Sequence, residues 1–186
     1  MKYTILLFLI AFIGCKTAQI SPPGFYEKIV KEKSVFNDFL KRESLVDLIK
    51  TMGNEFQNTD KLIMISFSNE DRSAFFIYDC TNDNYYFAQK YSGFVNYSYK
   101  KLPNREYAGE TNLFILKYVL DNKIEELKKI SEEAFKVGYV RIQQPIYVID
   151  TKNKKYIFER FKSFNVYKGK PVMNEKEFNQ FMKWGN

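Results

Sequence analysis

The chain has 186 residues, of which 45% are hydrophobic and 27% are charged, and its formal net charge is +7 at pH 7. This composition excludes a disordered polyelectrolyte and fits one globular domain of ordinary size. Histidine is absent and cysteine occurs only twice, so the chain cannot by itself supply an imidazole catalyst or a metal site built from several cysteines. We therefore expect neither a metal nor a cofactor.

The first fifteen residues have the layout of an export signal. Lys2 supplies a positive charge, and the apolar run Tyr3–Ile13 follows it. A helix of this length rises only about 16 Å, roughly half the thickness of the hydrocarbon core, so the run is too short for a comfortable transmembrane span. The small residue Gly14 ends the run before Cys15, and this order of features is typical of a signal peptide.

The segment Phe12-Ile13-Gly14-Cys15 resembles the lipobox of bacterial lipoproteins, with Phe12 in the place where leucine is usual. The resemblance covers residues 1–15 only. It implies that residues 1–14 are removed and that Cys15 is lipidated, with palmitate among its acyl chains. The chain would then be a lipid-anchored protein of the cell envelope, and the family's sorting habits favour the outer membrane because position 16 is not aspartate. The alternative is ordinary secretory cleavage near Lys16 and Ala18, which would leave Cys15 unmodified.

Lipidation of Cys15 would leave Cys80 as the only thiol, without a partner for a disulfide within the chain. Asp79 precedes Cys80, and a neighbouring negative charge raises the pKa of a thiol. We therefore expect Cys80 to be buried and structural and not to act as a nucleophile.

Residues 15–24 are expected to form a short tether, at most about 30 Å long, before a single domain over residues 25–186. The block from Phe25 to Gly53 has helical spacing but two opposed apolar faces, which predicts two helices with a break near Glu43-Ser44. Ser34 and Ser44 are the expected N-caps of these helices, and Gly53 is the expected end of the second.

Short β-rich runs follow, separated by turn residues at 69–73, 81–84 and 92–93. They predict a four-strand antiparallel meander over Leu62–Phe67, Ala74–Asp79, Tyr85–Tyr91 and Phe94–Leu102.

Apolar residues from Leu113 to Ala134 recur at steps of three and four and predict one long helix that ends at Gly138. The part Leu113–Leu120 is apolar on all sides, so a buried strand there is the alternative. A second block from Tyr139 to Phe164, with its turn at Thr151–Lys154, predicts a hairpin, and residues 174–184 predict a closing helix. Helices before, between and after antiparallel strands make the expected fold α+β.

Aromatic residues are dense between Tyr85 and Tyr99. Exposed rings on a shared sheet face would form a stacking platform for sugars or a protein, whereas buried rings would only pack across strands. Strand register decides between these alternatives. The candidate binding residues in this region are Tyr85, Phe87, Tyr91, Tyr97 and Tyr99.

The surplus of positive charge is C-terminal, because residues 151–186 contain nine Lys or Arg and three acidic residues. These lysines could face anionic headgroups or acidic glycans at the end of a short tether, or could simply keep a turn soluble. No recognisable nucleic-acid-binding motif is present, and an exported protein rarely meets nucleic acid. The candidate residues are Lys152, Lys154, Lys155, Lys162, Lys168 and Lys170.

Carboxylates that could act in pairs are Asp79 with Asp83, Glu106 with Glu110, and Asp150 with Glu159. Acid and base catalysis needs two such groups in one cleft, and spacing alone does not bring them together, so we assign no catalytic residue. The expected function is therefore a non-catalytic binding or assembly domain at the membrane, whose partner could be an envelope protein, a glycan or anionic lipid. The alternatives are a carboxylate-based glycan hydrolase and an inhibitor or immunity-like protein.

Overall fold

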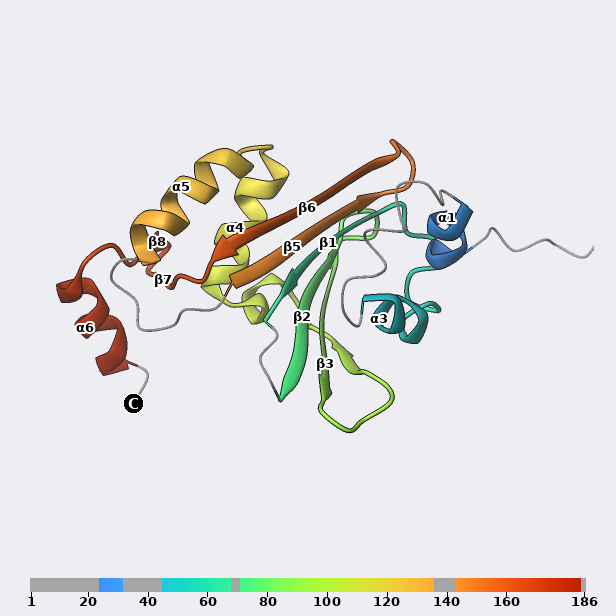
Figure 1. Cartoon of the computed structure of the whole chain (residues 1–186), viewed down its shortest axis with the longest axis horizontal. Coiled ribbons are helices and arrows are strands. Elements are labelled where there is room, and N and C mark those ends of the chain that lie inside the picture. The colour runs from blue at the N-terminus through green and yellow to red at the C-terminus, as the bar shows by residue number, and fades with distance from the viewer. Residues whose placement is uncertain (1–23, 32–44, 68–70, 136–142, 185–186) are drawn as a thin grey trace, which may run out of the picture.

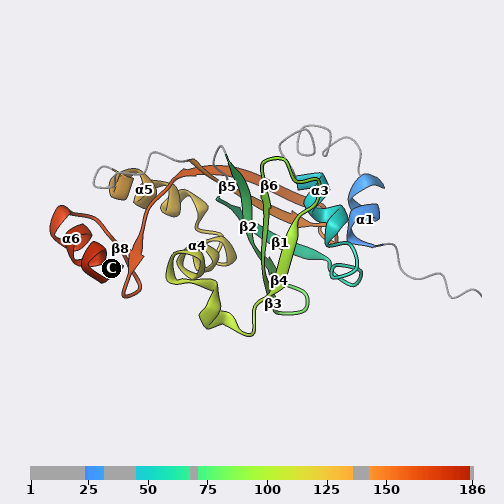
Figure 2. The ribbon, with the colours of Figure 1, turned by 90° about the horizontal axis from the view of Figure 1, so that it is seen from below.

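The computed structural model describes residues 24–31, 45–67, 71–135 and 143–184. They form an α+β fold with a six-stranded antiparallel sheet in the order β4-β3-β2-β1-β5-β6. Figures 1 and 2 show helices α1 and α3 on one side of the sheet and helices α4 and α5 on the other. The predicted fold class is confirmed.

The predicted meander is present, with each strand pairing with the next along the chain. Its last strand is shorter than predicted, because residues 92–97 form a loop in which Gly93 has a φ of 86°. The two-residue turn expected at Ser92-Gly93 is therefore wrong. The strands are β1 (Lys61–Ser66), β2 (Arg72–Asp79), β3 (Asn84–Tyr91) and β4 (Ser98–Lys101).

The second predicted hairpin is also present, as β5 (Gln143–Asp150) and β6 (Lys155–Lys162), with its turn at residues 151–154. Strand β5 also pairs with β1 and so joins the hairpin to the meander. Residues 62–66 of β1 are all buried, because a central strand that is covered on both faces has no solvent side. The small hairpin of β7 (Val166–Tyr167) and β8 (Lys170–Pro171) was not expected.

The single long helix predicted over Leu113–Ala134 is wrong, and so is the strand alternative for its first half. The segment forms two helices, α4 (Glu110–Leu120) and α5 (Ile124–Phe135). Asn122 between them has a φ of 57°, a left-handed conformation that Asn tolerates better than most residues and that interrupts a helix. The break redirects the chain, so that α4 and α5 each cover their own part of the sheet.

The helix α3 (Leu45–Thr51) and the closing helix α6 (Glu175–Trp184) agree with the expectation. The helix α1 (Phe25–Lys31) ends before Ser34, where the first helix was expected to begin, and so differs from the expectation. A short 3-10 helix, η1 (Arg105–Ala108), links β4 to α4. The predicted caps Ser34 and Ser44, the predicted break at Glu43-Ser44, and residues 1–23 with Cys15 all lie outside the described residues.

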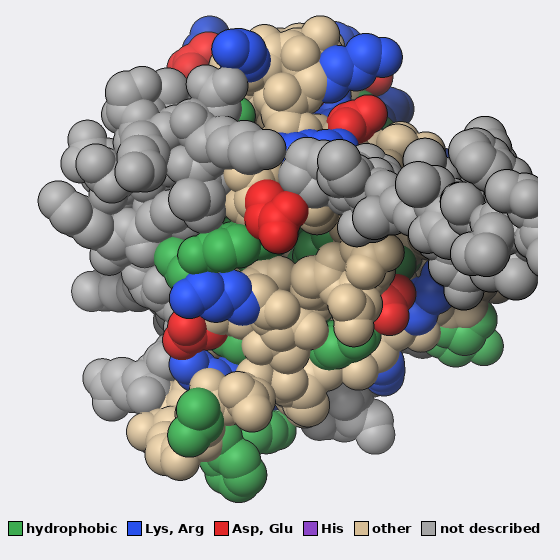
Figure 3. All heavy atoms as spheres, turned by 90° about the vertical axis from the view of Figure 1, so that its right-hand side faces the viewer, with side chains coloured by type: hydrophobic (Ala, Val, Ile, Leu, Met, Phe, Trp, Pro, Cys, Tyr) green, Lys and Arg blue, Asp and Glu red, His purple; other side chains and the backbone are tan. Residues whose placement is uncertain are grey.

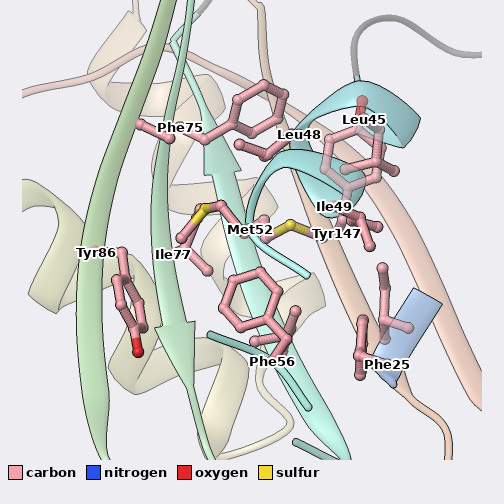
Figure 4. Close-up of a cluster of buried hydrophobic side chains, with 14 of the residues drawn as sticks. Phe25, Leu45, Leu48, Ile49, Met52, Phe56, Phe75, Ile77, Tyr86 and Tyr147 are labelled. Atoms are coloured by element: carbon pink, nitrogen blue, oxygen red, sulfur yellow. The ribbon is translucent and has the colours of Figure 1, made fainter. Parts of the chain in front are cut away.

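The sheet is packed on both faces. One cluster lies between the sheet and helices α1 and α3, and Figure 4 shows its side chains. A second cluster lies on the opposite face, under α4 and α5. Alternate residues of β1 belong to different clusters. Leu62 and Met64 lie in the first and Ile63 and Ile65 in the second, because successive side chains of a strand point to opposite faces.

Phe56 is the fully buried centre of the connection between α3 and β1. Its ring makes edge contacts with Phe25, at 6.1 Å between centroids, and with Tyr86, at 5.7 Å. Glu55, the residue before it, accepts a 3.3 Å hydrogen bond from the Tyr86 hydroxyl. The turn after α3 therefore ties the first helix to the third strand.

Candidate functional site

The predicted aromatic residues do not form one platform. Residues paired across antiparallel strands share a face, and Tyr99 pairs with Ala88, which puts it on the face opposite Tyr85 and Phe87. Tyr97 is only 5% exposed and packs edge-on against Phe75. The structure thus divides the set between the two sheet faces.

The six predicted lysines do not form one patch either. Lys152, Lys154 and Lys155 lie at the β5–β6 turn, whereas Lys168 and Lys170 lie at the β7–β8 hairpin. The length of β6, about 26 Å for a strand of eight residues, separates the two groups. Several of these lysines also have partners within the chain. Lys155 donates to Asn122, Lys162 pairs with Glu132, and Lys168 lies over the ring of Tyr167.

Two of the carboxylates considered for catalysis are engaged in their own turns. Asp79 is fully buried and accepts hydrogen bonds from the Thr59 hydroxyl at 2.8 Å, from the Thr81 amide at 2.9 Å and from Asn82. Asp150 accepts two hydrogen bonds from Asn153. Such saturated carboxylates stabilise turns.

The third pair, Asp150 with Glu159, is not brought together. Glu159 lies opposite Ile146, four residues along the ladder from the pair Asp150–Lys155, which corresponds to about 13 Å. Glu159 forms instead an ion pair of 2.9 Å with Lys128 of α5. It therefore joins the helix to the edge strand.

Cys80 is half-buried, so the expected full burial is wrong. Burial raises the pKa of its thiol to about 12, with the nearby Lys61 opposing the rise and Asp79 adding to it. The predicted direction is confirmed, although desolvation outweighs the charge of Asp79. Below pH 9 the thiolate that nucleophilic chemistry needs is scarce.

We expect Cys80 to react at least about tenfold more slowly with a disulfide reagent in the folded chain than in urea at pH 8, because the rise of its pKa from 9.0 to about 12 lowers the thiolate fraction by more than the greater nucleophilicity of that thiolate restores. Residues 15–186 with Cys15→Ser provide a single thiol for this measurement. Equal rates in the two conditions would contradict the assignment. The folded state should also lose stability as the pH rises from about 9 to about 12, because the unfolded thiol loses its proton first.

A groove of about 630 Å³ lies between α4 and the β3–β4 side of the sheet. Segment 101–105, from the end of β4 to the start of η1, also lines it. We call it the tyrosine groove. Tyr78, Asp83 and Tyr85 line its sheet side, segment 101–105 contributes Arg105, and α4 contributes Leu113, Leu116, Lys117 and Leu120, followed by Asp121.

The sheet wall of the tyrosine groove is built by cross-strand pairing. Tyr78 and Tyr85 are directly paired in the β2–β3 ladder, and their rings stack with centroids 4.8 Å apart. The hydroxyl of Tyr78 donates a 3.0 Å hydrogen bond to Asp83 in the turn between the two strands. Burial and this hydrogen bond raise the pKa of Tyr78 far above its usual value. Tyr78 therefore stays a neutral hydrogen-bonding group at physiological pH.

The charged side chains of the tyrosine groove are mixed in sign. The pKa of Tyr85 is raised mainly by burial and by the charge of Asp83, and Arg105 opposes this rise, which places both charges close to the ring. Within the described part of the chain, Arg105, Lys117 and Asp121 form no ion pair. Lys101, at the end of β4, also lines the groove and pairs with Tyr86 in the β3–β4 ladder.

Of the predicted site residues, only Tyr85 lies in the tyrosine groove. The opposite wall comes from α4, whose apolar residues were interpreted as core. One signal in the sequence could have indicated it, because Leu113–Leu120 is apolar on all sides, more than one buried helix face requires, and in the structure Leu120 is 41% exposed. Its neighbours in space depend on how α4 packs, which the spacing of the residues does not specify.

Over the described ranges, no helix is long and apolar enough to cross a bilayer, and no group of three or more acidic residues or cysteines is placed to hold a metal ion. No family model, no curated protein and no solved structure matches the chain.

Proposed function

We propose that this chain is a lipid-anchored protein of the bacterial cell envelope that binds an envelope saccharide in the tyrosine groove. The anchor is Cys15, at the end of the lipobox-like segment 12–15. Acyl chains contribute about 0.8 kcal/mol for each buried methylene, so several chains hold a protein at a membrane essentially permanently. The domain would then work within a tether's length of that membrane.

The observation that carries the saccharide proposal is the chemistry of the groove walls. Sugars present apolar C–H faces and hydroxyl groups that both donate and accept hydrogen bonds. The groove offers tyrosine rings and leucine side chains for the first, and Arg105, Lys117, Asp83 and Asp121 for the second. Its volume of about 630 Å³ is within the range of small-ligand sites, about 300–1,000 Å³.

Binding without turnover is favoured over the hydrolase alternative by the state of the carboxylates. Asp79 and Asp150 are saturated by turn hydrogen bonds, and Asp83 accepts one from Tyr78. A glycosidase needs one carboxyl group as acid and another as nucleophile or base. Asp83 and Asp121 are the only lining residues of the groove with carboxyl groups. Because Asp83 already accepts the hydrogen bond from Tyr78, Asp121 is left without a second carboxylate that is ready to act with it.

The experiment measures binding of two soluble probes, peptidoglycan disaccharide fragments and the core oligosaccharide of lipopolysaccharide, by calorimetry. Residues 15–186 with Cys15→Ser are compared with the same chain carrying Leu120→Ser, a change in the groove wall. The matched control is Met173→Ser, at a residue of similar exposure, 37% against 41%, outside the groove. We expect Leu120→Ser to weaken binding at least tenfold, about 1.4 kcal/mol, and Met173→Ser to leave it unchanged.

Failure of both probes to bind, or equal weakening by both substitutions, would overturn the assignment of the groove. New reducing ends in the incubated probe would instead make the protein a hydrolase, with Asp83 and Asp121 as the first residues to replace.

A further inference from the structure

The cations of the tyrosine groove are distributed unevenly along its walls. Segment 101–105 contributes Lys101 and Arg105 and contains no carboxylate, whereas the α4 wall contributes Lys117 together with Asp121. The amide of Asp121 donates a 2.9 Å hydrogen bond to the carbonyl of Lys117, one helical turn back. Side chains at this spacing are neighbours on a helix surface, so their charges largely offset each other. The surplus of positive charge therefore lies on segment 101–105.

Segment 101–105 is held beside the tyrosine rings by its own backbone. The amide of Leu102 donates a 2.8 Å hydrogen bond to the carbonyl of Tyr85, and the Leu102 side chain is buried. Asn104 then caps η1, because its side chain accepts a 2.9 Å hydrogen bond from a backbone amide of the first turn. Arg105 is the first residue of that turn. Its position at the edge of the groove is thus fixed from both sides.

The guanidinium of Arg105 has no carboxylate partner in the part of the chain that the structure describes. Glu106 follows it but does not line the groove, and Asp83 on the sheet wall accepts the hydrogen bond of Tyr78 instead. Arg105 nevertheless opposes the rise in the pKa of Tyr85, which places its charge close to that ring. An exposed cation with its donors available therefore adjoins the aromatic wall.

The side of the molecule formed by α1 and α3 shows a different arrangement of charge. Lys28 of α1 forms a 2.8 Å ion pair with Asp60, and Lys90 of β3 forms one of 3.4 Å with Asp47 of α3. Figure 3 looks at this side and shows most Lys and Arg side chains next to Asp or Glu side chains. Segment 101–105 differs because it brings two cations to a concave site without a carboxylate of its own.

We propose that the saccharide bound in the tyrosine groove carries an acidic group, a carboxylate or a phosphate, and that Arg105 binds this group. The inference rests on the saccharide site of the proposed function and adds the charge of its ligand. A guanidinium is planar and matches either oxyanion with two parallel hydrogen bonds. A neutral sugar offers it only hydroxyl groups, which form weaker hydrogen bonds. Lys101 on the same segment adds a second cation.

Three disaccharides with the same backbone test the charge of the ligand. The first is neutral N,N′-diacetylchitobiose. The second is N-acetylglucosaminyl-N-acetylmuramic acid, which adds a lactyl carboxylate, and the third is chitobiose phosphorylated at a primary hydroxyl. Calorimetry with residues 15–186 carrying Cys15→Ser measures the three dissociation constants. We expect at least one acidic disaccharide to bind about tenfold more tightly than the neutral one, and the tighter of the two identifies the carboxylate or the phosphate as the group recognised.

Arg105→Gln tests which residue binds the acidic group. The substitution removes the charge at an exposed side chain, so the circular dichroism spectrum should stay the same. We expect it to weaken binding of the preferred acidic disaccharide about tenfold more than binding of the neutral one. The matched control is Arg160→Gln, at an exposed arginine of β6 on the opposite edge of the sheet, where the guanidinium lies over the ring of Phe158. It removes the same charge and should leave the preference unchanged.

The possible failures separate this inference from the site on which it rests. Equal affinity for all three disaccharides would overturn the acidic ligand and leave the saccharide site standing. If none of the three binds, the inference is overturned, and the Leu120→Ser experiment with its own probes decides whether the site exists. A preference that survives Arg105→Gln, or that Arg160→Gln reduces equally, would contradict the role of Arg105.

Discussion

Replacing Phe56 with alanine should lower the free energy of unfolding by about 3–5 kcal/mol. The ring is fully buried and contacts Phe25 and Tyr86 on two other elements. Its removal leaves a cavity that cannot collapse easily, because its partners belong to α1 and β3, and the lost area and lost contacts both add to the cost. Urea unfolding of residues 15–186 with Cys15→Ser, followed by circular dichroism, measures the change.

Gln57→Ala is the matched control for this prediction. Gln57 follows Phe56 in the same turn, is exposed, and makes only a 3.5 Å hydrogen bond with Asn54. We expect this substitution to change stability by less than about 0.5 kcal/mol. A cost below about 1 kcal/mol for Phe56→Ala would show that the turn after α3 does not pack against the sheet as described.

The second large effect concerns the anchor. In bacteria fed a labelled palmitate analogue, Cys15→Ser should abolish incorporation of the label, because no other residue of the lipobox-like segment can be acylated. The variant should also leave the membrane fraction in low-detergent buffer. Cells, not purified protein, are needed here, because the export and lipidation enzymes act on the precursor.

Cys80→Ser is the control that separates the two cysteines. Cys80 is half-buried with a pKa of about 12, so we expect its substitution to leave the label unchanged. Label retained in Cys15→Ser, or absent from the unmodified protein, would contradict the anchor. The saccharide site would then need another explanation for how the domain reaches the envelope.

Local patterns in the sequence determined a large part of the secondary structure. The short β-rich runs and turn residues from Leu62 to Tyr91 predict the first three strands, the turn at Thr151–Lys154 defines the second hairpin, and spacing predicts α6. Each of these signals operates within a few residues of the chain. The interruption at Asn122 was missed because a single left-handed residue does not disturb the apolar spacing on either side of it.

Only the tertiary structure decided how these elements combine. The pairing of β5 with β1 joins residues more than eighty positions apart, and no local pattern specifies which buried strands become neighbours. Register then placed Tyr85 and Tyr99 on opposite faces, because a shift of one residue moves every side chain of a strand to the other side. The tyrosine groove depends on strand pairing, on register and on the packing of α4. For that reason the sequence alone indicated only one of its tyrosines.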